Sequence, residues 1–225
     1  MALDRWLLDQ HCLGLMPSVL RFYRWQPVAI SLGYHQRRYP DYWSDLTWQG
    51  QPVDLVRRPS GGRAVLHQGD LTYAVITSAS GSRQQVYEQI CEFLVQGWRS
   101  LGLPLRYGTA GRGYIHNPGC FTTATAADLV LENGAKLVGS AQLRRAGGLL
   151  QHGSMPLRTE ASLYQQIFGS ADSLPDGAVL GSFSDEQIIA ALVSAAQKCW
   201  LAEFEAQSLT PDEYLAATQS VVAVK

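Results

Sequence analysis

Tight-turn signals in the second half of the chain constrain its fold more than any other feature of the sequence. Strand-like runs cover 129–132, 136–144 and 149–157, and the dipeptides Asn133-Gly134 and Gly147-Gly148 lie between them. These dipeptides favour hairpin turns, since glycine and asparagine accept the positive φ that such turns require. The sequence therefore predicts an antiparallel β-meander in this region.

Strict alternation along the middle strand, 136–144, would divide its side chains between the two faces of the sheet. One face would carry Lys136, Val138, Ser140 and Gln142, and the other Leu137, Gly139, Ala141 and Leu143. Lys136 is therefore expected to share a face with polar side chains.

Hydrophobic spacing and end signals predict further helices and strands. The helices cover the first fifteen residues, 84–101, 184 to about 204, and a segment opening at Thr210 and Pro211. The further strands cover 19–23, 28–32, 53–56 and 71–76. Alternating apolar residues indicate strands, whereas apolar residues three and four apart indicate helices. The pattern predicts an α+β fold in which helices flank a mixed, largely antiparallel sheet.

The whole chain, 1–225, is predicted to be a single domain. Domains commonly span roughly 100–200 residues, with larger ones frequent, and no repeat, low-complexity tract or linker interrupts this sequence. Residues 158–225 would form its helical C-terminal part.

The charge balance and the hydropathy exclude several classes of function. Lys and Arg number 18 against 19 Asp and Glu, so the formal net charge is −1 and a basic nucleic-acid-binding surface is not expected. The longest apolar stretch, 188–196, is well short of the roughly 20 residues that span a membrane. The first residues also lack the basic and apolar segments of a secretory signal. We therefore expect a cytoplasmic protein that binds neither nucleic acid nor membranes.

The cysteines and histidines show no metal-binding spacing. Cys12, Cys91, Cys120 and Cys199 form no C-x-x-C pair, so neither a zinc site nor a disulfide framework is predicted. The first, second and fourth of these cysteines fall in helical segments, where buried packing is the usual role. Cys120 instead lies at the far end of a glycine-rich loop, 108–119.

The segment 57–67 is the strongest candidate for a ligand-binding loop. It reads Arg-Arg-Pro-Ser-Gly-Gly-Arg-Ala-Val-Leu-His. Glycines let a backbone approach a ligand closely, and arginines donate hydrogen bonds to carboxylate or phosphate groups. On these residues alone, a tight strand connection with solvated arginines is the commoner explanation.

Three motifs together resemble a known family. They are Arg-Arg-x-x-Gly-Gly-x-x-Val-x-His at 57–67, Gly-x-Lys-x-Val-Gly-Ser-Ala-Gln at 134–142, and Gln-His-Gly-Ser at 151–154. With the opening Met-Ala-Leu-Asp and the stretch 21–34, they resemble the lipoate–protein ligase and octanoyltransferase group over roughly 1–157. The resemblance implies a biotin/lipoate protein ligase-like catalytic domain, with a mixed sheet flanked by helices.

The resemblance also implies which residues act. Cys120 matches the acyl-accepting cysteine of the transferases, and Lys136 would stabilise its thiolate and the developing oxyanion. The residues expected to bind substrate are Arg57, Arg58, Ser60, Gly61, Gly62, Arg63, His67, Gly139, Ser140 and His152. The two histidines are expected to line the pocket rather than to act as bases. The three arginines could contact a phosphopantetheine, an adenylate phosphate or only water. Lysines on strands are more commonly solvated, and this is the alternative role of Lys136.

The family's chemistry implies an acyltransferase. Cys120 would take an octanoyl (or lipoyl) group from an acyl carrier protein, and a lysine of a lipoyl domain or glycine-cleavage H protein would then accept it. Replacing a thioester by an amide is favourable, so neither ATP nor a metal is expected. ATP-dependent ligases commonly have a third glycine where this chain has Arg63, which favours the cysteine-dependent octanoyltransferases.

Three alternatives stay open on the sequence. The first is a lipoate–protein ligase that uses ATP and Mg²⁺ to form lipoyl-adenylate, with Cys120 incidental. The second is a non-catalytic acyl-binding or lipoyl-domain-binding protein, and the third an amidotransferase that moves octanoyl between lipoyl domains. Family members also usually have a strand before Met-Ala-Leu-Asp, so either that strand is dispensable or the true start lies upstream. The run Thr-Thr-Ala-Thr-Ala-Ala at 122–127 departs from the transferases and leaves the pocket and the acceptor open.

Overall fold

A six-stranded antiparallel sheet forms the centre of the molecule, with strand order β1-β7-β11-β10-β9-β8. The structure is a computed structural model that describes residues 1–108 and 128–219. The strands of this sheet are β1 (Val19–Tyr23), β7 (Asp70–Ser78), β8 (Arg106–Tyr107), β9 (Asp128–Val130), β10 (Lys136–Arg145) and β11 (Gly148–Pro156).

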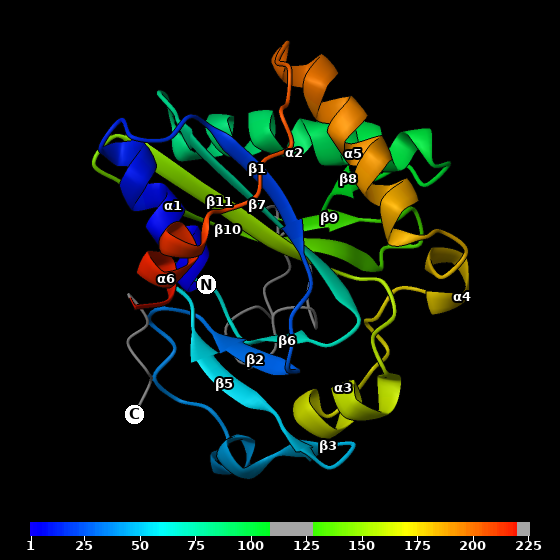
Figure 1. Ribbon diagram of the computed structural model, residues 1–225. Helices are drawn as coiled ribbons and strands as arrows, with labels where there is room; N and C mark the ends of the chain where they lie inside the picture. The colour runs from blue at the N-terminus through cyan, green and yellow to red at the C-terminus, as the bar shows by residue number, and fades with distance from the viewer. Residues whose placement is uncertain (109–127, 220–225) are drawn as a thin grey trace.

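A second, three-stranded sheet lies apart from the first, below it in the view of Figure 1. Its strands are β2 (Ala29–Leu32), β5 (Asp54–Arg57) and β6 (Val65–His67), with β2 parallel to β5 and antiparallel to β6. The 3₁₀ helix η1 (Asp41–Asp45), the β-ladder of β3 (Thr47–Trp48) with β4 (Gln51–Pro52), and α3 (Ala161–Phe168) complete this part. Its core packs Ile30 and Trp43 against Leu163 of α3.

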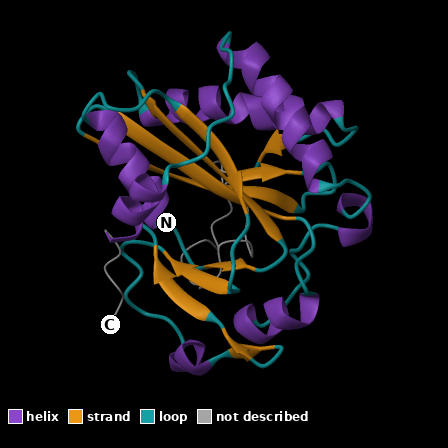
Figure 2. Cartoon of the chain, viewed as in Figure 1, coloured by secondary structure: helices purple, strands orange, loops and turns teal. Residues whose placement is uncertain are grey.

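Two long helices, α2 (Arg83–Ser100) and α5 (Asp185–Trp200), cover one face of the large sheet, with the short α4 (Gly177–Leu180) before α5. Both long helices begin with a capping box, at Ser82 and at Ser184, which satisfies backbone N–H groups that the first turn leaves unpaired. They approach closely because Gly97 has no side chain where it meets Leu192. Figure 2 shows these helices in purple outside the orange strands.

The opposite face of the large sheet is covered by α1 (Ala2–Cys12), against which α6 (Pro211–Gln219) packs. The alternation of β7 explains this division, since successive side chains of a strand point to opposite faces. Tyr73 and Val75 pack toward α2, whereas Ala74 and Ile76 pack toward α1.

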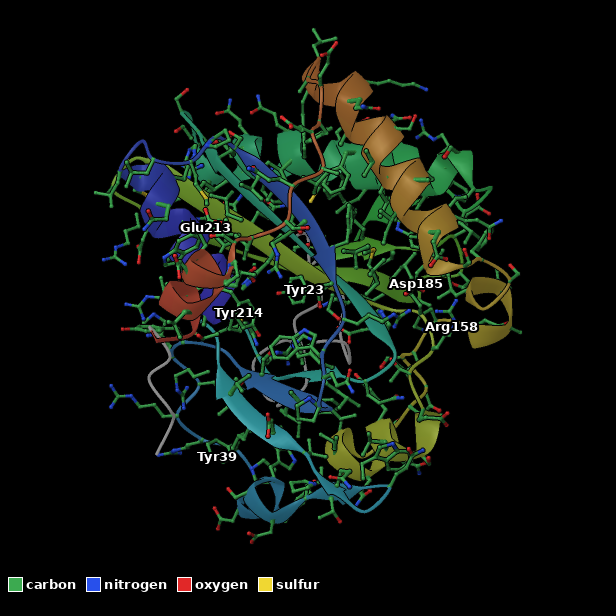
Figure 3. All side chains as sticks on the ribbon, in the orientation of Figure 1. Tyr23, Tyr39, Arg158, Asp185, Glu213 and Tyr214 are labelled. Atoms are coloured by element: carbon green, nitrogen blue, oxygen red, sulfur yellow. The ribbon has the colours of Figure 1, made fainter. Side chains whose placement is uncertain are left out.

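A pair of arginines ties the start of α5 to two strand ends. Asp185 accepts hydrogen bonds from Arg24, which follows β1, and from Arg158, which follows β11, at 2.6 and 2.7 Å. The bond from Arg24, together with that from Arg158, lowers the pKa of Asp185 to about 2. Figure 3 shows Arg158 and Asp185 beside each other at the right of the molecule.

The α+β fold and the antiparallel meander at 129–157 are confirmed. Three expectations are corrected. The first helix ends at Cys12 rather than residue 15, and α5 ends at Trp200 rather than near 204, because Leu201 takes a left-handed conformation. Strands also divide between two main sheets, where one sheet was expected, since β2 pairs with β5 and β6 in a sheet of its own.

Among the described residues, no helix combines the length and the apolar character that crossing a bilayer requires.

Candidate active site

A pocket lies where the two sheets face each other. It encloses about 50 Å³, several times the roughly 10–15 Å³ that one water molecule occupies. Its walls come from β2 and β6 of the small sheet, from β7, β10 and β11 of the large sheet, and from the loop that follows β5. The lining residues are Met1, Ser31, Arg58, Gly61, Gly62, Val65, His67, Thr72, Gly139, Ser140, Ala141, His152, Gly153 and Ser154.

The loop after β5 is held in place by Arg58 and by a close backbone approach. The buried Arg58 guanidinium donates to the carbonyl oxygens of Ser31, Gly61 and Arg63 at 2.6–3.1 Å. A Cβ atom on Gly33 would lie 1.8 Å from the carbonyl oxygen of Gly62, which itself has φ +96°. Only glycine permits this approach. The glycine at position 33 therefore allows the loop to pack directly against the end of β2.

One wall of the pocket carries a hydrogen-bonded chain of Asp70, His67 and Ser31. His67 Nδ1 lies 2.8 Å from Asp70 Oδ2, and His67 Nε2 lies 2.8 Å from Ser31 Oγ. Asp70 Oδ2 also accepts bonds from Thr72 and Ser154. All of these side chains are buried, so the carboxylate and the ring are held in one orientation by groups from four strands.

A second chain of the same residue types runs through Asp4, His152 and Ser60. His152 Nε2 lies 2.5 Å from Ser60 Oγ, but its Nδ1 is 3.5 Å from Asp4 Oδ2, longer than a good hydrogen bond. Asp4 also pairs with Arg21 and accepts a bond from Tyr23 at 2.8 Å.

Burial shifts the two ionisable groups of this second chain. Burial lowers the pKa of His152 by more than the neighbouring Asp4 raises it. Burial would raise the pKa of Asp4, but the nearby His152 and the Arg21 charge outweigh it, so the pKa of this carboxyl lies well below its ordinary value. The fold therefore holds a neutral imidazole next to a charged carboxylate.

This arrangement predicts acid sensitivity that His152→Gln should reduce. With a folded-state pKa below the unfolded value of about 6.5, the unfolded chain takes up the proton first as pH falls. The free energy of unfolding should therefore decrease below pH 6.5, by up to about 1.4 kcal/mol per pH unit for this one group. Urea unfolding of both proteins at pH 7.5, 6.5 and 5.5 measures the slope. An identical pH dependence in the variant would contradict this prediction.

Lys136 is buried, and its ammonium lies 2.8 Å from Asp128 Oδ1 of the neighbouring strand, with each side chain no more than 5% exposed. The solvated lysine considered above is therefore wrong. The strict alternation expected along this strand is interrupted at Leu137, because the pairing of β10 with β9 shifts register between Lys136 and Val138. Leu137 and Val138, neighbours in sequence, are both fully buried, and Gly139, Ser140 and Ala141 line the pocket in succession.

Comparison with known proteins identifies the family. Residues 1–188 match the family described as the lipoyl protein ligase A/B catalytic domain. The chain belongs to this family. It is 36% identical over 210 residues to octanoyltransferase LipM of Lysinibacillus sphaericus, covering 84% of this chain and 75% of that protein. It is 40% identical over 169 residues to octanoyltransferase LipM of Kyrpidia tusciae, covering 70% of this chain and 61%, less than two thirds, of that protein.

Solved structures of lipoyl protein ligase relatives share the fold. Lipoate-protein ligase A bound with ATP matches with a TM-score of 0.79 at 23% identity, over 97% of this chain and 86% of that one. A bi-partite lipoate protein ligase from Thermoplasma acidophilum, studied with its E2 lipoyl domain, matches with a TM-score of 0.72 at 21% identity, over 97% and 84%. The resemblance stated from the sequence motifs, and the fold that it implied, are confirmed.

Most residues that the lipoyl ligase resemblance selected meet at the pocket. Seven of the predicted substrate-binding residues line it, namely Arg58, Gly61, Gly62, His67, Gly139, Ser140 and His152. Ser60 bonds to one of them, His152. Arg57 departs from the expectation, because its guanidinium donates to the carbonyl oxygens of Gly33 and Gln36 and so braces a loop. The backbone carbonyl of Arg63 accepts a hydrogen bond from Arg58. Arg63 is not among the residues that line the pocket. Cys120 lies outside the described residues.

Asp4, Ser31 and Asp70 belong to the two hydrogen-bonded chains but were not predicted from the sequence. Asp4 belongs to the Met-Ala-Leu-Asp motif that carried part of the lipoyl ligase resemblance. Its place in that motif was a signal that could have identified it as a site residue. Asp70 lies three residues after His67. The two side chains meet because β6 ends at His67 and β7 begins at Asp70, with only a short connection between them. No local pattern marks Ser31, whose partners come from other strands.

The three cysteines that the structure describes, Cys12, Cys91 and Cys199, lie in helices of the lipoyl ligase fold. Burial raises the pKa of the Cys91 thiol to about 12 and also raises that of Cys199, which disfavours the reactive thiolate. All three lie in helices as expected, but only Cys91 is fully buried, because Cys12 and Cys199 sit at helix ends that solvent reaches.

Within the part of the chain that the structure describes, no three His, Cys, Asp or Glu side chains gather as a metal-ligand cluster would.

Proposed function

We propose that this chain is an octanoyltransferase of protein lipoylation. It would take octanoyl from octanoyl-acyl carrier protein onto Cys120 and pass it to a lysine of a lipoyl domain or glycine-cleavage H protein. The names of its bacterial relatives support octanoyl transfer. The observation that carries the proposal is that two motifs far apart in sequence, 57–67 and 134–142, supply opposing walls of one pocket.

The first half-reaction is thioester exchange. The Cys120 thiolate attacks the thioester carbonyl and the C–S bond of the donor breaks. The phosphopantetheine sulfur then takes the proton that Cys120 gave up and leaves as a thiol. Lys136 supports this step as a buried cation on the strand that enters the pocket wall, because a nearby ammonium lowers a thiol's pKa. The Asp128 carboxylate, 2.8 Å away, pairs with that ammonium inside the fold.

The second half-reaction is aminolysis of the acyl-enzyme. The acceptor lysine amine attacks the Cys120 thioester, the C–S bond breaks, and an amide forms while the thiol is restored. Backbone N–H groups of the loop that contains Gly62, or of β10 near Gly139, are suited to stabilise the oxyanion. Arg58 holds the carbonyl groups of this loop, so it acts by positioning the loop.

The energetics and the partners follow from this chemistry. A thioester is higher in free energy than the amide that replaces it, so we propose that neither ATP nor a metal ion takes part. The lipoylation family implies lipoyl-domain acceptors, and we propose a carrier protein as the donor, with the whole chain, 1–225, as one catalytic domain. A cytoplasmic location remains a prediction of the sequence.

Intact-protein mass spectrometry tests the proposal. Incubation with octanoyl-acyl carrier protein without ATP is expected to add one octanoyl group to the wild-type chain and none to Cys120→Ser. An apo lipoyl domain should then discharge the adduct and gain the same mass. Cys199→Ser is the matched control, because burial raises the pKa of the Cys199 thiol. This variant should still be acylated.

The same experiment distinguishes the alternatives. Lipoylation that appears only with lipoate, ATP and Mg²⁺, and that survives Cys120→Ser, would establish a ligase. An adduct formed from an octanoylated lipoyl domain but not from the carrier protein would establish an amidotransferase. Binding with no turnover under any of these conditions would establish a binding protein.

A further inference from the structure

We propose that Asp70, His67 and Ser31 form a proton relay that removes one proton from the acceptor lysine, so that its amine can attack the acyl-enzyme. The inference rests on the proposed octanoyl transfer and assigns a group that this chemistry needs. A lysine side chain is an ammonium ion at neutral pH and must lose two protons to become an amide nitrogen. The restored thiol accounts for one of them, and the other needs a base.

The direction of the hydrogen bonds between Asp70, His67 and Ser31 is determined by the groups at the two ends of this series. Asp70 Oδ2 is an acceptor at 2.8 Å from His67 Nδ1, so Nδ1 carries a hydrogen and Nε2 of the neutral ring is an acceptor. Arg58, which can only donate, gives a hydrogen bond to Ser31 Oγ at 3.2 Å. The hydroxyl hydrogen of Ser31 is therefore free to point at His67 Nε2, 2.8 Å away.

This order of hydroxyl, imidazole and carboxylate is the one that lets a serine pass a proton to histidine in hydrolases. Ser31 and His67 both line the pocket, whereas Asp70 lies behind them. The Trp25 ring stacks on His67 with 4.0 Å between ring centres, which fixes the plane of the imidazole. The relay thus has one end open to a ligand and the other end anchored in the core.

The second chain, Asp4, His152 and Ser60, is less suited to this task. Its histidine–carboxylate separation is 3.5 Å instead of 2.8 Å. The Asp4 carboxylate is also engaged by the Arg21 guanidinium, which weakens its attraction for a positive imidazole. Asp70 makes no such side-chain ion pair with an arginine among the described contacts, since Arg24 bonds only to its backbone oxygen.

The proposed step balances as follows. The acceptor ammonium first gives one proton to Ser31 Oγ, while the Ser31 hydroxyl proton moves to His67 Nε2. The free amine then forms its bond to the thioester carbon. His67 becomes an imidazolium that Asp70 stabilises. The Cys120 sulfur leaves as the C–S bond breaks and takes the other proton, and the imidazolium then releases its proton to solvent.

Single-turnover discharge of the acyl-enzyme tests the relay. Ser31→Ala, His67→Gln and Asp70→Asn are first loaded with octanoyl to completion, so that only the second half-reaction is timed. Their discharge by an apo lipoyl domain should be slower by about 100-fold or more, the usual contribution of general acid–base catalysis. Discharge by hydroxylamine, which is unprotonated at neutral pH and needs no base, should be the same in all of them.

His11→Gln is the matched control, because His11 Nε2 also bonds to a serine of the large sheet, Ser78, at 2.9 Å. It lies outside the pocket and should discharge like the wild type. Ser31→Ala removes only a hydroxyl, which keeps the test decisive if Asp70→Asn does not fold.

The outcomes separate the relay from the reaction on which it rests. No adduct on the wild type overturns both. An adduct that the Ser31→Ala variant passes to the lipoyl domain at the wild-type rate overturns the relay and leaves the transferase standing. A variant slowed equally with hydroxylamine shows a structural role only, which also overturns the relay.

Discussion

Lys136→Met is expected to abolish acylation of Cys120 and to destabilise the protein in one step. The substitution keeps most of the side-chain volume but removes the ammonium from a buried ion pair with Asp128, 2.8 Å away. Breaking one partner of a buried pair costs about 3–5 kcal/mol. Loss of the cation also removes the charge that favours the thiolate. Mass-spectrometric acylation rates and urea unfolding measure the two effects.

The double variant Lys136→Met/Asp128→Asn separates the two contributions. Removing the carboxylate charge as well should restore much of the free energy of unfolding, because an uncompensated buried charge is what makes the single variant costly. Acylation should stay absent, since the cation is still missing. Recovery of acylation in the double variant would show that Lys136 serves the fold and not the reaction.

Gly33→Ala is expected to cause the second large effect, by displacing the loop that follows β5. Its new Cβ atom would lie 1.8 Å from the Gly62 carbonyl oxygen, and a backbone atom cannot move aside as a flexible side chain can. Overpacking of this kind costs about 1–3 kcal/mol and sometimes more. A shift of about 1 Å in a substrate-positioning loop can also cost about 100-fold in rate.

Gly177→Ala is the matched control for Gly33→Ala. Its Cβ atom would meet nothing within 4 Å, and it begins a short helix, where alanine is favoured over glycine. Thermal unfolding and acylation rates should therefore match the wild type or improve slightly. If Gly33→Ala behaved like this control, the close approach of β2 to the loop would not matter to the site.

The elements that the sequence predicted well are those determined by neighbours along the chain. Turns join β9, β10 and β11 as expected. The first contains Asn133-Gly134, whereas the second is Ala146-Gly147, one residue earlier than predicted, and Gly134 and Gly147 both have positive φ. The capping box at Ser184 begins α5. The bounds of helix α3, strand β6 and the separate small sheet were not foreseen. These short segments are stabilised by contacts with distant residues, as Leu163 is by Trp43.

The candidate site divides in the same way. Arg58 and His67 of the motif at 57–67 line the pocket. Arg57 of the same motif instead donates to the carbonyl oxygens of Gly33 and Gln36, because the fold places those groups beside its guanidinium.

By itself, the sequence determined the α+β class, the meander, the family resemblance and the set of residue types available for chemistry. Those properties depend on local backbone preferences and on motifs that can be read in order. Only the tertiary structure decided that Lys136 is buried against Asp128 and that Ser31, His67 and Asp70 form one chain. Both depend on strand pairing and on the packing of two sheets, which bring together residues whose separation along the chain carries no signal of their contact.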